Sequence, residues 1–231
     1  MKLTPTDVAT YAQTTNLPLY EIADLSKIPN ITKPDFLVVA GYGQKIPTGW
    51  LEFPRVMAIN MHQSLLPEYR GANPSEWAIL RGETKTGVTL LKMSEDFDQG
   101  DIIAQKEIAI EPTDTRQTLY DKLYRLGAEL LVETLPKKEL HPRPQPKGDF
   151  FYARRLTRDD GFVPWEKFDI HSKELETKLR AFEGWPGVWT ITPFHKRLKL
   201  LELGPEPIVQ LEGKSPQTFV QFSRAYRTVA S

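Results

Sequence analysis

The chain has 231 residues and no cysteine, which excludes disulfides, thiolate catalysis and cysteine-ligated metal centres. This length suits one large domain, or a medium domain and a small one, and a hydrophobic content of 40% is typical of a protein with a core. The formal charge is zero, no apolar run is long enough to cross a bilayer, and the N-terminus has no signal-peptide pattern, so we expect a reduced cytoplasmic protein without a membrane span.

The zero net charge conceals an asymmetry between the two parts of the chain. Residues 1–136 contain 13 Lys and Arg against 18 Asp and Glu, whereas residues 137–231 contain 17 against 12. A basic C-terminal part is compatible with an anionic partner such as RNA or a nucleotide. A mixed, solvated surface explains so small an excess at least as well.

The N-terminal part begins the pattern of an α/β domain. A short helix, capped by Thr6 or Asp7, is expected first, followed by a strand at Leu19–Ile22. The continuous apolar runs "DFLVVAGYG" and "PRVMAINMH" are typical of buried parallel strands that lead into loops.

The next segments extend that pattern to about residue 136. "NPSEWAILRGE" predicts a helix, and "KTGVTLLKMS" and "DIIAQKEIAI" predict two strands joined by the acidic loop "EDFDQG". Residues 115–135 predict a long amphipathic helix with leucines on one face. Alternating strands and helices of this kind indicate an α/β domain.

A change in composition follows this domain. "PKKELHPRPQPKGD" carries four prolines and predicts a linker, or an extended segment that wraps around the domain. A helix near "HSKELETKLRAFE" and strand-like segments at "RLKLLELG" and "PIVQLEG" predict a small β-rich module. We therefore expect a domain, a linker and a second module over residues 1–136, 137–150 and 151–231.

The first candidate for chemistry is "INMHQSLLPEYRG", residues 59–71. Side chains two positions apart in an extended chain share a face, so Asn60, His62 and Ser64 point the same way. They follow a buried strand, at the end where open α/β sheets bind ligands. An amide that stabilises an oxyanion and a histidine that moves a proton suit acyl transfer. The alternative is a buried polar turn in which His62 only bonds to the backbone.

Two further loops are candidates for binding. "EDFDQGD", residues 95–101, could hold a divalent cation, but it lacks the alternating ligands and closing Glu of an EF-hand. One of its carboxylates could instead orient His62, or the loop could be a solvated turn. "GYGQKIP", residues 41–47, lacks the third glycine of a dinucleotide fingerprint, so that function is rejected. Its backbone could line a pocket for a flat heterocycle.

In this order and spacing, these segments resemble the family of formyltransferases that use 10-formyltetrahydrofolate. The matching catalytic-domain segments are "INMHQSLLPEYRG", "GETKTGVTLLKM" and "DFDQGDIIAQ". "YARRLTRDDGFVPW" and "LRAFEGWPGVWT" are similar to the linker and early second domain of methionyl-tRNA formyltransferases. The resemblance covers about residues 4–230.

The resemblance implies a partial Rossmann-like formyltransferase domain, with a mostly parallel sheet flanked by helices, and then a shortened β-rich C-terminal module. It implies that a primary amine attacks the formyl carbon of 10-formyltetrahydrofolate. Asn60 would bind the formyl oxygen, His62 would act as electrophile and proton donor, and Asp98 would hold His62 charged and help carry the proton of the amine. It implies no metal.

The resemblance also implies the residues that bind the two substrates. Folate would lie between the two candidate loops, and the acceptor would meet the loop after His62. The implied folate contacts are Ala40, Gly41, Tyr42, Gly43, Ile46, Pro47, Asp96, Phe97 and Gly100. The implied acceptor contacts are Ser64, Leu65, Leu66, Pro67, Arg70 and Gly71.

The acceptor implied first is initiator methionyl-tRNA, in translation initiation. A nucleotide-linked amino sugar is the main alternative, and glycinamide ribonucleotide fits less well because its formyltransferases need no C-terminal module. A non-catalytic protein of this fold that binds folate or a partner is the remaining alternative. The oligomeric state stays open.

Two departures from the family pattern lead to further expectations. A family catalytic domain begins with a Gly-bearing strand, loop and helix and two more strands before the segment that matches Pro5. We therefore expect roughly the first third of that domain to be absent and an apolar sheet edge to be exposed. After "GVWT" the chain passes almost at once to "RLKLLELG", so we expect a shortened second domain rather than a full oligonucleotide-binding barrel.

Overall fold

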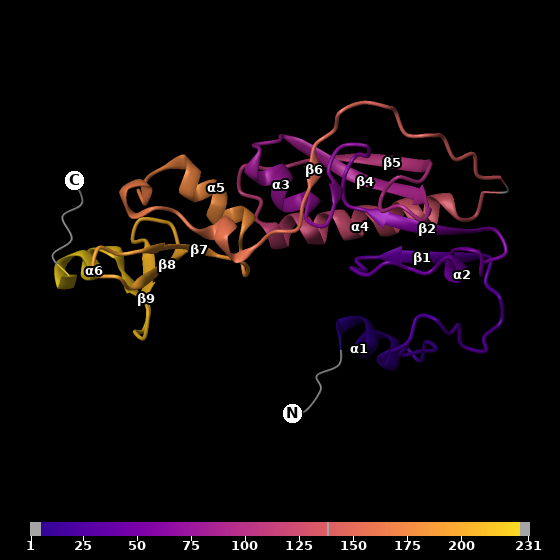
Figure 1. The fold of residues 1–231 in the computed structure, drawn as a ribbon, viewed down its shortest axis with the longest axis horizontal. Coiled ribbons are helices and arrows are strands. Elements are labelled where there is room, and N and C mark those ends of the chain that lie inside the picture. Colours follow the sequence, from indigo (N-terminus) through magenta and orange to yellow (C-terminus); the bar gives the residue numbers. More distant parts are fainter. Residues whose placement is uncertain (1–5, 138, 227–231) are drawn as a thin grey trace.

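The fold is known from a computed structural model that describes residues 6–137 and 139–226 (Figure 1). In chain order its elements, with η for a 3-10 helix, are α1 (Asp7–Thr14), β1 (Phe36–Ala40), α2 (Thr48–Leu51), β2 (Met57–His62), β3 (Arg70–Gly71), α3 (Pro74–Leu80), β4 (Lys85–Lys92), β5 (Ile102–Ala109), α4 (Arg116–Thr134), β6 (Tyr152–Ala153), η1 (Arg158–Gly161), η2 (Trp165–Lys167), α5 (Lys173–Ala181), β7 (Val188–Ile191), β8 (Arg197–Glu202), β9 (Ile208–Leu211), β10 (Gln217–Thr218) and α6 (Phe219–Tyr226). Of the helices in the described ranges, none combines the length and the apolar character that a membrane crossing requires.

Local sequence signals explain where the helices begin. Thr6 caps α1, as predicted, because its hydroxyl oxygen accepts a hydrogen bond from the Ala9 amide at 3.2 Å. Thr115 and Thr118 form a reciprocal capping box at the start of α4. Pro74 occupies the first turn of α3, where its missing N–H costs no helical hydrogen bond.

The first sheet has the strand order β1-β2-β4-β5. Strands β1 and β2 are parallel, whereas β2 with β4 and β4 with β5 are antiparallel. The α/β class is confirmed, but the described sheet is mixed rather than mostly parallel. The loop at residues 93–101 reverses the chain directly between β4 and β5, and a direct reversal of this kind produces antiparallel neighbours.

Helix α4 packs along this sheet (Figure 1). Leu119 and Leu123 of the helix are fully buried, as are Ile59 of β2 and Leu90 of β4. Gly127 permits a close approach, because a Cβ there would lie 2.2 Å from the Met61 sulfur. The leucine face predicted for this helix is therefore the face that covers the sheet.

Two features of the N-terminal part bear on the predictions. Residues Leu19–Ile22 form no strand, which corrects the predicted one, since the described chain places no partner strand beside this half-exposed segment. Strand β1 is the last strand of the described sheet on its side, and Val38 is 38% exposed. The predicted exposed apolar edge therefore lies at β1.

The C-terminal module contains an antiparallel sheet in the order β10-β9-β8-β7, flanked by α5 and α6. Its core includes Leu198, Val209 and Phe222, which are all fully buried. The small β-rich module predicted from the sequence is thus confirmed, whereas its exact boundary with the linker stays a prediction.

The proline-rich segment between α4 and β6 contains no helix or strand over its described residues, and it arches back over the first sheet (Figure 1). It is tied to that sheet, because Arg143 and Ile102 exchange two backbone hydrogen bonds of 2.8 Å. Strand β6 then pairs in parallel with β3. The predicted extended wrap therefore describes this segment better than a free linker.

Candidate active site

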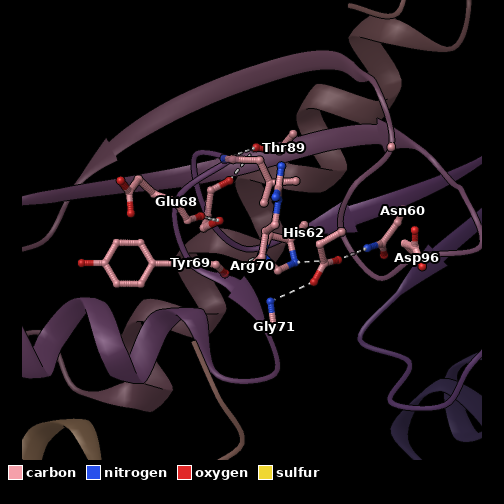
Figure 2. A network of polar contacts seen from close by, with 12 residues as sticks. Asn60, His62, Glu68, Tyr69, Arg70, Gly71, Thr89 and Asp96 are labelled. Carbon is pink, nitrogen blue, oxygen red and sulfur yellow. Dashed lines mark hydrogen bonds and ion pairs between the residues drawn. The ribbon is translucent and has the colours of Figure 1, made fainter. Parts of the chain in front are cut away.

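Strand β2 places two candidate residues on one face at the centre of the sheet. Met61 packs against Gly127 of α4, so Asn60 and His62, one position away on either side, point to the other face. The side chain of His62 is only 7% exposed. The alternation predicted from the sequence therefore brings the amide and the imidazole together (Figure 2).

Asp98 reaches the same point from the loop between β4 and β5. One oxygen of its carboxylate accepts a hydrogen bond from the Asn60 amide nitrogen at 3.2 Å and lies 3.4 Å from Nδ1 of His62 (Figure 2). The other oxygen accepts from the backbone N–H of Gly71 at 2.9 Å. Three donors from two segments thus surround one carboxylate that is 9% exposed.

Both nitrogens of the His62 ring face oxygen acceptors. Nε2 lies 2.9 Å from the carbonyl oxygen of Tyr69, and Nδ1 faces the Asp98 carboxylate. A neutral imidazole can donate only one hydrogen bond, whereas the imidazolium can donate to both oxygens. These two contacts orient the ring in the site.

Side chains of β4 and β5 form hydrogen bonds with the loop that follows His62. The fully buried hydroxyl of Thr89 donates to the Ser64 carbonyl at 2.6 Å and accepts from the Leu66 amide at 3.0 Å. The Gln105 amide nitrogen donates to the Leu66 carbonyl at 2.8 Å. The hydroxyl of Ser64 itself donates to the carbonyl of Glu68. These bonds fix the shape of the loop.

A cavity of about 500 Å³ opens beside the catalytic candidates. The loop after β1 and the acidic loop after β4 line it, together with the end of β2. The predicted site residues that line it are Gly41, Tyr42, Gly43, Ile46, Asn60, His62, Gly71, Asp96, Phe97 and Asp98. The predicted site residues outside the lining are Ala40, Pro47, Ser64, Leu65, Leu66, Pro67, Arg70 and Gly100.

Two glycines, one outside the lining and one within it, act on the shape of the site. Gly100 lies so close to the end of β4 that a Cβ would meet the Lys92 carbonyl oxygen at 1.7 Å, which requires glycine there. Gly41 has a φ of +64°, and a Cβ on it would lie 2.2 Å from the Tyr124 hydroxyl oxygen. Gly41 thus allows the loop after β1 to approach α4 closely.

The sequence did not reveal one wall of the cavity, which contains Asn73, Tyr120, Tyr124, Tyr152 and Arg155. Tyr120 and Tyr124 lie one turn apart on α4 and stack with ring centroids 6.1 Å apart. Burial, assisted by the negative charge of Glu76, raises the pKa of Tyr120 to about 12. The signal available in the sequence was a pair of tyrosines on a helix face otherwise rich in leucine.

Tyr152 and Arg155 reach the cavity through the pairing of β3 with β6, which no local pattern predicts. Asn73 connects this wall to the rest of the fold. Its amide nitrogen donates to the buried Glu76 at 2.9 Å, and its oxygen accepts from the Leu156 backbone at 2.9 Å. The segment after the linker is therefore bonded to the start of α3.

The carboxylates of the acidic loop do not gather around a point where a metal could bind. Asp98 turns toward Asn60 and His62, while Glu95 accepts a hydrogen bond from the Thr48 hydroxyl. Within residues 6–137 and 139–226, no three acidic or histidine side chains are arranged to hold an ion. Of the three roles considered for this loop, a cation site, a solvated turn and a carboxylate that orients His62, the contact of Asp98 with His62 favours the last.

Comparison with known proteins identifies the family. A family model described as formyl transferase matches residues 4–135. The chain belongs to the formyltransferase family. The resemblance stated from the segments around Asn60, His62 and Asp98 is therefore confirmed.

Two curated relatives are named methionyl-tRNA formyltransferase. The protein from Myxococcus xanthus is 44% identical over 160 residues, which cover 68% of this chain and 50% of the relative. The protein from Geobacter metallireducens is 35% identical over 211 residues, which cover 87% of this chain and 66% of the relative. The chain thus spans between half and two thirds of the length of these relatives.

A solved structure with a similar fold is that of HypX from Aquifex aeolicus in complex with tetrahydrofolic acid. It is 25% identical to this chain, with a TM-score of 0.62, and the match covers 73% of this chain and 29% of that chain.

Proposed function

We propose that this formyltransferase-family chain transfers the formyl group of 10-formyltetrahydrofolate to a primary amine, namely the amino group of initiator methionyl-tRNA. The observation that carries the proposal is the convergence of Asn60, His62 and Asp98 beside a cavity of about 500 Å³. The names of both relatives support this acceptor.

Asn60 stabilises the charge that develops on the formyl oxygen. Its amide nitrogen uses one N–H on Asp98 and has a second N–H, which donates to the oxygen as the amine attacks. A fixed donor in such a position is worth about 3–4 kcal/mol of transition-state stabilisation. The bond to Asp98 holds the amide in place before the substrate arrives.

His62 and Asp98 handle the protons. The 3.4 Å contact between Nδ1 and the carboxylate is longer than a strong hydrogen bond, so the Nδ1–H is shared between Asp98 and a group that enters the cavity. His62 polarises the formyl carbonyl as the amine nitrogen bonds to its carbon and the bond from that carbon to N10 of the folate breaks. The Asp98 carboxylate accepts the proton that the amine loses and returns it through His62 to N10, so that tetrahydrofolate leaves uncharged at that nitrogen. Acid–base assistance of this kind contributes about 10²–10⁴-fold in rate.

The cavity fits the folate that the family implies. Its volume of about 500 Å³ is typical of a site for a small organic molecule. Gly41 and Gly43, which present only backbone atoms, line it together with Asp96, which suits a flat heterocycle rich in donors and acceptors. When bound there, 10-formyltetrahydrofolate supplies the activated formyl group.

The part of the lining formed by α4 and residues 152–155 would receive the acceptor. The rings of Tyr120, Tyr124 and Tyr152 can stack with a nucleobase, and the Arg155 guanidinium can pair with a phosphate. A methionyl-tRNA 3′ end and a nucleotide-linked amino sugar share these groups. The amino sugar therefore remains the alternative acceptor that the experiment must include.

The test incubates the purified chain with 10-formyltetrahydrofolate and, in separate reactions, charged initiator tRNA or a nucleotide-linked amino sugar. The measured quantities are the formylated acceptor and the released tetrahydrofolate, for wild type and for His62→Ala. The expected result is formylation of the tRNA and a rate reduced at least 100-fold by the substitution.

Two other outcomes are informative. Formylation of the amino sugar alone would establish the alternative acceptor. Formylation of neither, by a folded protein that still binds tetrahydrofolate, would contradict both catalytic proposals and favour a folate-binding protein without turnover.

A further inference from the structure

A side chain of the proline-rich segment reaches into the loops that carry the catalytic residues. The Gln145 amide nitrogen donates to the backbone carbonyl oxygens of Asp98 at 2.7 Å and of Gly100 at 2.8 Å. Its amide oxygen accepts from Nε of Arg70 at 3.1 Å and from a terminal guanidinium nitrogen of Arg70 at 2.6 Å. Both N–H donors of the Gln145 amide and both acceptor positions of its oxygen are therefore occupied.

The chemistry of these partners fixes the orientation of the amide. A guanidinium can only donate and a backbone carbonyl can only accept, so the oxygen must face Arg70 and the nitrogen must face Asp98 and Gly100. A carboxylate at this position could accept from Arg70 but could not donate to the two carbonyls. Only an amide satisfies both sides.

The backbone on which Gln145 acts has an unusual conformation. Asp98 has a φ of +55°, a left-handed conformation that non-glycine residues seldom adopt and that neighbours must hold. Gln145 bonds to the carbonyl of this very residue, while Gly71, next to Arg70, donates to its side chain. Asp98 is therefore held through its backbone as well as through its carboxylate.

Gln145 itself is firmly placed. Its neighbours Pro144 and Pro146 restrict the backbone to extended conformations, and Arg143 pairs with Ile102 at the start of β5. The amide therefore arrives at the loops from an anchored segment.

We propose that Gln145 is a positioning residue, which holds the Asp98 loop against the loop of Arg70 and so sets the distance from the carboxylate to His62. The inference rests on the proposed formyl transfer. Gln145 does not line the cavity, so it acts through Asp98 rather than on a substrate.

Two variants separate this role from simple anchoring. Gln145→Glu keeps the acceptor for Arg70 and adds a charge, so the segment stays attached and the melting temperature stays near that of wild type. It removes the donor to Asp98 and Gly100. Gln145→Met has similar volume and removes both sides, and Lys147→Ala, an exposed change in the same segment, is the control.

We expect both Gln145 variants to lower kcat by about 10- to 100-fold, because a displacement of about 1 Å in a catalytic group has effects of this size. The KM for 10-formyltetrahydrofolate should change by less than about threefold, because Gln145 itself does not line the cavity and its bond to Asp98 acts on a group of the chemical step. An anchoring role alone predicts that activity follows stability, so Gln145→Glu would then keep the kcat of wild type. That result would overturn the inference.

A second measurement does not depend on turnover. In protein with ¹⁵N-labelled histidine, the Nδ1 proton of His62, assigned by its loss in His62→Gln, reports the contact with Asp98. We expect this resonance to shift or broaden in both Gln145 variants and to stay unchanged in Lys147→Ala. An unchanged resonance in both Gln145 variants would overturn the inference, even if Gln145→Met alone were unstable.

The two measurements keep the failures distinct. If wild type transfers no formyl group but the resonance changes in the variants, the proposed function fails and the positioning role stands. If wild type is active and neither kcat nor the resonance changes in the variants, the function stands and the positioning role fails.

Discussion

The two walls of the cavity are built in different ways. The wall with the proposed catalytic residues and folate loops comes from residues 60–62 at the end of β2 and from residues 41–46 and 96–98 in the loops that follow β1 and β4. The second wall combines α4 with residues 152–155, and the pairing of β6 with β3, in a separate two-stranded sheet, holds these residues beside the site. The first wall is specified locally and the second by long-range contacts, so substitutions should affect chemistry in the first and stability or acceptor binding in the second.

The largest effect is expected in the first wall, from Asp98→Asn. The amide keeps nearly the same shape but places no negative charge beside the His62 ring and cannot accept a proton from the amine. We expect kcat to fall by about 10²–10³-fold with little change in melting temperature. Steady-state kinetics and thermal unfolding measure the two quantities. An Asp98→Asn protein with more than a third of the wild-type kcat would show that the carboxylate is not part of the chemistry.

The second effect is expected in the second wall, from the ion pair between Glu76 and Arg116 at the start of α4. Glu76 is 1% exposed, and one of its oxygens lies 3.0 Å from Nε of Arg116. Arg116→Met leaves this buried carboxylate without its cation, which costs about 3 kcal/mol or more in the free energy of unfolding. Glu76→Gln, which removes the buried charge, should cost less. Urea unfolding of both variants measures the difference. Equal losses of unfolding free energy in the two variants would contradict the claim that the buried Glu76 carboxylate is stabilised by Arg116.

The smallest effect is expected from Tyr120→Phe on the same wall. The pKa of Tyr120 is raised to about 12 in the folded state, above its ordinary value of 10.0. The unfolded chain therefore loses this proton first, and wild-type stability should decline as the pH rises from about 10 to 12. The phenylalanine variant should decline less over that range. If the free energy of unfolding fell equally with pH in wild type and in Tyr120→Phe, Tyr120 would not be protected from ionisation in the folded state.

The contrast between the walls also explains how much could be predicted from the sequence. Asn60 and His62 were predictable because a strand places alternate residues on one face. The acidic loop was predicted to supply a carboxylate to His62, and the family resemblance implied that this carboxylate is Asp98. Gly100 was assigned to folate, whereas the structure places it outside the cavity lining, against the Lys92 carbonyl. A glycine in a binding loop and a glycine in a tight approach of two backbones look alike in a sequence.

Arg155 and Gln145 could not be predicted because their positions depend on the path of the proline-rich segment. The sequence indicated an extended stretch there but held no signal for the two-residue pairing of β3 with β6. The strand expected at Leu19–Ile22 was wrong for a related reason. Its apolar residues are compatible with a strand, but a strand also needs a neighbour whose backbone can bond to it.

The most direct test of the central claim follows the formyl group itself. In a single turnover, 10-formyltetrahydrofolate labelled with ¹³C in the formyl group is mixed with the protein and charged initiator tRNA. Mass spectrometry of the acceptor should then detect the labelled N-formyl group with wild type, and at least 100-fold more slowly with Asn60→Ala or His62→Ala. Equal rates in wild type and in both variants, or no labelled acceptor with a folded, folate-binding wild type, would contradict the roles assigned to Asn60 and His62.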